Sequence, residues 1–206
     1  MALKRHRLCR RRKALGLSQE RLAELLGVER STVVRWENAS PDLFSAHGAL
    51  LLLAAVIAAG RRDTKTAGCH LSDAAELATQ LGSDGNRLWT GFGPMDVTIH
   101  AVSAAVRAEM PERAVEIGTR LETSRLPAVL VGRRAQVHVD LAVAATMGTA
   151  DRSAATLHLL EAERVAPETV HTNIQARMLL VDLLSKERRA ATPGLRPLAE
   201  RAGVLV

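Results

Sequence analysis

The stretch LSQERLAELLGVERSTVVRWEN, residues 17–38, decides the fold of the N-terminal part of the chain. Ser18 is a residue type that caps helix N-termini, and Glu20 then falls in the positively polarised first turn. Leucines recur with the spacing of one helix face, at Leu22, Leu25 and Leu26. Gly27 tolerates the left-handed conformation that commonly ends a helix. The stretch therefore predicts a short amphipathic helix that stops at Gly27.

A second helix is predicted to begin near Glu29. At about 100° per residue it places Val33 and Trp36 on one side, where they can pack onto the leucines. An arc of about 140° on the other side holds Arg30, Ser31, Val34, Arg35 and Asn38. Such a polar ridge suits the DNA major groove, where Arg reads guanine bidentately and Ser or Thr contacts base edges or phosphates. In an arbitrary helix, Arg30 and Arg35 would instead be solvated cations paired with Glu29 or Glu37, and this alternative stays open.

The charge of the chain is concentrated at its N-terminus. Residues 1–40 hold ten Lys and Arg against four Glu, a net charge of +6. The remaining residues carry 18 basic and 18 acidic side chains, so the formal charge of +6 lies entirely in the first segment. This distribution predicts that the N-terminal segment attracts a polyanion.

Residues 8–38 resemble the Cro/repressor-type (XRE-like) helix-turn-helix. The resemblance rests on Ser18-Gln19-Glu20, Leu22-Ala23, Gly27-Val28, Ser31-Thr32-Val33 and Trp36-Glu37-Asn38. It implies a DNA phosphate contact for Gln19 and Thr32, base reading by Arg30, Ser31 and Arg35, and a thymine-methyl contact for Val34. Three arginines of the preceding helix are expected to include phosphate contacts: Arg10, Arg11 and Arg12.

Beyond this head, apolar residues recur at helical spacing and no stretch alternates like a half-buried strand. The predicted helices cover residues 49–59, 71–81, 95–108, 112–121, 134–147, 153–165, 172–184 and 195–202. The stretch LPAVLVG, residues 126–132, is left as helix or loop. The composition changes at NASPDLFSAHG, the predicted linker. We therefore expect an all-α protein with a helix-turn-helix head at 1–45 and a helical body at 46–206.

The body has a weak internal repeat at offsets of 40 and 41 residues. Its three copies are Ala74, Ala78, Leu81; then Ala114, Gly118, Leu121, Pro127; then Ala155, Leu159, Ala162, Pro167. Small residues let antiparallel helices approach closely, and the proline is expected to stop the second helix of each pair. The pattern resembles tetratricopeptide repeats, with a longer period. An ordinary alanine-rich bundle with coincidental spacing is the alternative.

RLWTGFGP and the following helices resemble the C-terminal region of longer actinobacterial XRE-type regulators with a tetratricopeptide-like domain, here shortened between the two parts. In that family a glycine turn and two further helices complete the head, whereas Ala39 stands at the glycine position. The missing cover for Leu22, Leu26 and Trp36 is expected from residues after the motif: Leu43, Phe44, Leu50 and Leu51.

The sequence favours a cytoplasmic protein. GALLLLAAVIAAG, residues 48–60, is 13 residues long where a spanning helix needs roughly 20, so a buried helix is preferred to a membrane contact. The N-terminal segment has charge without the apolar region of a secretory signal. Cys9 and Cys69 are too far apart for a zinc knuckle or a disulfide framework.

Nothing in the sequence predicts an enzyme, a cofactor or a metal. GFGP, residues 91–94, lacks the third glycine of a dinucleotide loop and predicts a turn that opens a helix at Pro94. Trp89 and Phe92 are expected to fill the seam between helical pairs, with a ligand platform as the alternative. Four histidines stand at spacings that build no metal site: His100, His138, His158 and His171.

Three hypotheses follow. The leading one is a sequence-specific DNA-binding transcriptional regulator whose repeat body forms a homodimer or binds a peptide or protein partner. The second is a protein-interaction scaffold with an incomplete, inactive head. The third, a binder of RNA or of polyanions in general, rests on KRHRLCRRRK alone.

Overall fold

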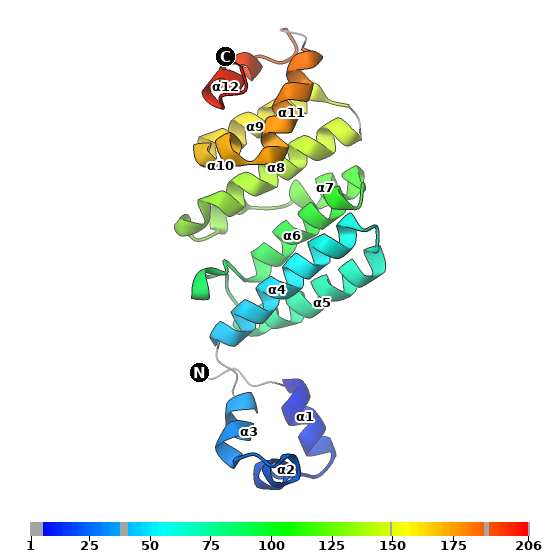
Figure 1. Ribbon diagram of the computed structural model, residues 1–206, viewed down its shortest axis with the longest axis vertical. Coiled ribbons are helices and arrows are strands. Elements are labelled where there is room, and N and C mark those ends of the chain that lie inside the picture. The colour runs from blue at the N-terminus through cyan, green and yellow to red at the C-terminus, as the bar shows by residue number, and fades with distance from the viewer. Residues whose placement is uncertain (1–5, 38–40, 149, 188–189, 206) are drawn as a thin grey trace.

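The structure, a computed structural model, describes residues 6–37, 41–148, 150–187 and 190–205. The side chains of four further residues lie outside the description: His6, Arg7, Arg35 and Trp36. Every regular element in the described residues is a helix, which confirms the predicted all-α class (Figure 1). A three-helix head is followed by a body of stacked helical hairpins.

The head consists of α1 (His6–Ala14), α2 (Gln19–Leu26) and α3 (Arg30–Glu37). The hydroxyl of Ser18 accepts a hydrogen bond from the Arg21 amide at 3.0 Å, as expected of an N-cap. Gly27 ends α2 in the left-handed conformation at φ 64°. Its amide and that of Val28 donate to the carbonyls of Glu24 and Ala23, which is the pattern of a Schellman motif. Local sequence signals thus set both ends of α2.

The body pairs α4 (Pro41–Gly60) with α5 (Thr64–Leu81), α6 (Pro94–Arg107) with α7 (Pro111–Gly118), and α8 (Val131–Met147) with α9 (Arg152–Val165). It continues with α10 (Pro167–Thr172), α11 (Ile174–Ser185) and α12 (Leu195–Arg201). Short 3₁₀ turns lie at η1 (Arg87–Trp89), η2 (Thr123–Arg125) and η3 (Ala128–Leu130). A helix is found in each predicted range, but the one predicted at 172–184 begins only at Ile174, after the extended Asn173, and α10 was not predicted. LPAVLVG proves to be a turn that leads into α8 at Val131.

The small residues of the repeat lie at contacts between helices, within a hairpin at Ala74 and between hairpins at Gly118. Ala74, Ala114 and Ala155 are fully buried. A Cβ on Gly118 would lie 2.6 Å from Leu141, so this glycine lets α7 approach α8 closely. Pro127 does not act as expected, because α7 already ends at Gly118. Pro167 does follow the end of α9 at Val165, and it also begins α10. The tetratricopeptide relationship remains a prediction.

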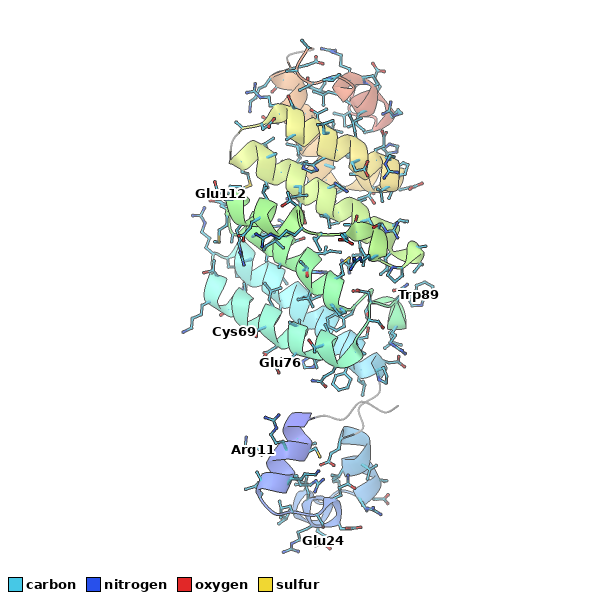
Figure 2. The ribbon with its side chains drawn as sticks, turned by 180° about the vertical axis from the view of Figure 1, so that it is seen from behind. Arg11, Glu24, Cys69, Glu76, Trp89 and Glu112 are labelled. Carbon is cyan, nitrogen blue, oxygen red and sulfur yellow. The ribbon has the colours of Figure 1, made fainter. Side chains whose placement is uncertain are left out.

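Two further expectations are corrected. The predicted linker is largely helical, because Pro41 suits the first position of a helix and Asp42 its first turn. α4 therefore runs uninterrupted through the predicted domain boundary at 45/46. Trp89 does not fill a seam: it is 88% exposed and points away from the body (Figure 2), and only Phe92 is buried. Phe92 lies against Gly48, where a Cβ would come within 2.0 Å of the ring.

α4 has one face that is buried in the body and one face that is exposed. Its inner face, which includes Leu52, Ala55 and Ala59, packs into the body, where α4 contacts α5 and α6. By length and composition it is the one helix in the described ranges that could cross a membrane. The prediction of a buried helix over residues 48–60 therefore holds for one face only.

Candidate nucleic-acid interface

α2 and α3 pack against each other across a tight turn, and each carries one buried apolar side chain. Val33 on α3 is fully buried, and Ala23 on α2 is nearly so. The carbonyl of Ala23 also accepts the Val28 amide at 3.0 Å, which holds the turn close to α2. Because Val33 faces inward, the opposite side of α3 is left toward solvent.

That side presents the predicted ridge at the N-terminal end of α3. Arg30 and Ser31 are exposed, while Thr32 and Val34 are partly buried. The Arg30 Nε lies 3.1 Å from Glu20 Oε1 on α2, and each side chain is 61% exposed. The predicted alternative had Arg30 paired with Glu29 or Glu37, so its acidic partner proves to be a different residue. The placements of the Arg35 side chain and of Asn38 lie outside the described residues.

The Ser31 hydroxyl donates to Glu29 Oε2 at 3.2 Å. Both partners are exposed, so water competes with this bond and Ser31 stays available to an incoming ligand. Two carboxylates, Glu20 and Glu29, thus border the ridge at the start of α3.

A buried polar network joins the three helices of the head. Arg12 on α1 donates through Nε and Nη2 to the two carboxylate oxygens of Glu37, at 2.6 Å and 3.0 Å. Its Nη1 donates to the Leu17 carbonyl at 2.6 Å. Gln19 donates from Nε2 to Glu37 Oε2 at 2.7 Å. The Glu37 pKa is lowered chiefly by the Arg12 hydrogen bond, against the effect of burial, and the Arg12 pKa is raised by the same bond.

This network gives Arg12 a different role from the other two arginines of α1. Arg10 and Arg11 are exposed, whereas the Arg12 side chain is only 9% exposed and is committed to Glu37. Arg12 is therefore placed to hold the head together, and Arg10 and Arg11 are the cations of this run that reach solvent. Gln19, expected at a phosphate, is also engaged by Glu37 in the free protein.

The head keeps an uncovered apolar surface. Leu15, Leu25 and Leu26 are each more than half exposed. The expectation that residues after the motif cover the head is wrong for Leu26: Leu43 and Leu50 are themselves exposed, and Leu51 packs with Leu52 inside the body. The cause is that α4 folds as one continuous helix against α5 and α6, so its apolar residues are not free to turn back.

The body holds two partly buried polar clusters, each formed between helices. Within the described ranges, no group of three or more His, Cys, Asp or Glu side chains could hold a metal ion. His138 on α8 and His158 on α9 bring their Nδ1 atoms to 3.4 Å, and burial lowers the pKa of both. Asp140 on α8 is buried between Ser103 and Gln136, which donate to it, and burial raises its pKa. Sequence spacing missed both clusters because each joins side chains of two helices: α8 with α9 for the histidines, and α6 with α8 for Asp140.

Comparison with known proteins agrees with the geometry of the head. Residues 10–44 match the helix-turn-helix family model. No curated protein matches the chain, and no solved structure does. The match covers most of the head and the first turn of α4, and it supports an XRE-type helix-turn-helix in this segment.

Proposed function

We propose that the chain is a bacterial, cytoplasmic transcriptional regulator whose head binds double-stranded DNA selectively through the N-terminal half of α3. The observation that carries the proposal is the exposure of Arg30 and Ser31 in the first turn of α3. Ser31 lies opposite the buried Val33, and Arg30 lies at the edge of the same exposed arc. In helix-turn-helix proteins the N-terminal residues of the second helix contact base edges in the major groove.

The pairing of Arg30 with Glu20 does not prevent DNA binding. Ion pairs between exposed side chains contribute only about 0–1 kcal/mol. A bidentate contact between an arginine and guanine discriminates by about 1–3 kcal/mol. Arg30 can therefore exchange Glu20 for a base at little cost.

We assign the part of the DNA affinity that does not depend on base sequence to the exposed cations of α1. Arg10 and Arg11 stand on the most basic segment of the chain, and each phosphate that a cation neutralises releases counterions from the duplex. Thr32 is assigned a phosphate contact and Val34 a thymine methyl. Gln19 can reach phosphate only by leaving Glu37. This mechanism requires no cofactor.

We propose that the body controls how the head is positioned on DNA. It would do so by pairing two copies of the chain or by binding a peptide or protein. Two half-sites about one helical turn apart are read by a two-fold dimer. Grooves between helices accept extended or helical peptides.

Selection of duplexes from a random library, followed by titration at several salt concentrations, tests the proposal. We expect a preferred sequence, and loss of that preference in the Arg30→Ala, Arg35→Ala double variant. Arg125→Ala serves as the control, since Arg125 is an exposed cation of the body paired with Glu122. Tight binding with a steep salt dependence and no preferred sequence would favour a general polyanion binder. Absence of binding would favour the scaffold hypothesis.

A further inference from the structure

The outer face of α4 is an uncovered apolar seam. Leu43, Leu50 and Ile57 are spaced seven residues apart, and Leu53 lies between the last two. Each is at least half exposed. In heptad notation the first three take a positions, and the d positions hold Ala46, Leu53 and Gly60. We call these six residues the α4 seam. The polar neighbours of the seam on the same face are Asp42 and His47, with Arg61 just beyond the end of α4.

We propose that the α4 seam is the surface through which two copies of this chain associate. A repeat of apolar a and d positions is the pattern that a second helix of the same kind packs into. A two-fold interface uses the same patch on both partners, so a single self-complementary stripe is sufficient. The inference deepens the proposed function by naming the surface of the dimer, but the seam itself does not depend on DNA binding.

A membrane is not the occupant, because α4 is tied to the rest of the body on its other sides. Ser45 forms a hydrogen bond of 2.6 Å with Thr90, and Asp42 lies 3.5 Å from Arg87. The inner face of α4 belongs to the apolar clusters with α5. Insertion across a bilayer would break these contacts and expose polar groups to hydrocarbon.

The head of the same chain does not cover the seam. It lies beyond the N-terminal end of α4 (Figure 1), and Leu50, Leu53 and Ile57 are each at least half exposed.

The seam alone is smaller than a standard protein–protein interface, so the proposed contact between two copies extends to η1. A strip about 24 Å long and about 10 Å wide is less than the roughly 800 Å² per partner of a standard interface. Leu88 and Trp89 are exposed on η1, which is held beside the start of α4 by the Arg87 and Thr90 contacts. Leu88 and Trp89 have positive φ angles of 48° and 60°, conformations that side-chain-bearing residues seldom adopt. Exposed Trp is a frequent anchor of protein interfaces, and we assign Trp89 to the border of this one.

The test is the mass of the full chain in solution without DNA, measured by sedimentation equilibrium at micromolar concentration. We expect twice the 22.2 kDa of one chain. Leu50→Lys and Leu53→Lys should each weaken the dimer by at least about tenfold, since burial of a leucine contributes more than the 1.4 kcal/mol that equals a factor of ten. Both residues are exposed, so circular dichroism should show an unchanged helix content.

Two variants of matched exposure serve as controls. Leu157 on α9 is 64% exposed and Met178 on α11 is 69% exposed, against 66% for Leu50. Leu157→Lys and Met178→Lys should leave the dimer intact. A monomeric wild type, or a dimer that survives Leu50→Lys with Leu53→Lys, overturns the proposal. So does a dimer broken by Met178→Lys, or association only with lipid vesicles.

The DNA-reading proposal is tested by different variants, so its failure can be told apart from failure of the interface. Arg30→Ala with Arg35→Ala should abolish sequence preference and leave the dimer mass unchanged. A dimer that depends on the α4 seam but shows no DNA preference would support the interface and overturn the regulator.

Discussion

The guanidinium of Arg12 on α1 meets the carboxylate of Glu37 at the end of α3 at 2.6 Å and 3.0 Å, and both side chains are nearly buried. Gln19 completes the arrangement from α2. Since Val33 and Ala23 are the only fully buried apolar side chains among the described residues of the head, this polar contact is a principal link between its helices.

Removing one partner of this buried pair should unfold the head. Glu37→Ala leaves the Arg12 guanidinium buried without its counter-charge, and such a loss costs about 3–5 kcal/mol. We expect the amides of α1–α3 to lose protection in hydrogen exchange, while those of α8 and α9 keep it. The control is Arg21→Ala, which breaks an exposed pair with Glu24 worth at most about 1 kcal/mol. Equal protection of the head in both variants would contradict this role for Glu37.

The same pair predicts an acid-sensitive head. The Glu37 pKa is lowered in the folded protein, so the unfolded chain binds more protons as pH falls. The stabilisation is therefore present above the ordinary glutamate value of 4.5 and is lost as pH falls through the lowered pKa. NMR spectra of the head amides should show unfolding below about pH 4 before the body melts. Glu37→Gln should weaken the dependence on pH in this range.

Glu20 should restrain DNA binding. Its carboxylate holds Arg30 and adds a negative charge beside the face assigned to the duplex. Glu20→Gln keeps the shape of the side chain and removes the charge, so we expect affinity for the preferred duplex to rise several-fold at low salt, and the gain to shrink at high salt. Glu112→Gln on α7 is the control, since this residue lies in the body (Figure 2). An unchanged affinity in Glu20→Gln would mean that Arg30 does not approach the duplex.

Close packing of Phe92 on α4 predicts opposite effects for two glycine substitutions. A Cβ at Gly48 would lie 2.0 Å from the buried Phe92 ring, so Gly48→Ala should destabilise the body by about 1–3 kcal/mol. Gly68 lies within α5 with open space around its Cβ position, and Gly68→Ala should stabilise by about 0.5–1 kcal/mol. Urea denaturation followed by circular dichroism measures both. A tolerated Gly48→Ala would show that the ring can move away.

Local signals predicted most of the helices, but not the start of α4 or the short α10. Ser18, Gly27 and the leucine spacing define α2, and Pro94 begins α6 as expected. Each of these features acts within one turn of the residue that encodes it, so it can be read from a single sequence.

Contacts between distant residues could not be predicted in the same way. Arg12 and Glu37 are 25 residues apart, and His138 and His158 are 20 apart. Arg12 reads as one of three equivalent cations in the sequence, and only its position on α1 relative to α3 distinguishes it. The prediction that Trp89 is buried is wrong. Large aromatic residues are usually buried, but the turn at η1 directs this side chain outward.

The most direct measurement is the affinity of wild type and Arg30→Ala for the preferred duplex and for duplexes changed at one base pair at a time. If Arg30 reads a base, the variant loses about 1–3 kcal/mol on the preferred duplex and no longer discriminates at one base pair, while Arg125→Ala behaves as wild type. If Arg30→Ala weakens binding to all duplexes equally, or leaves every preference in place, then α3 does not read DNA through this residue.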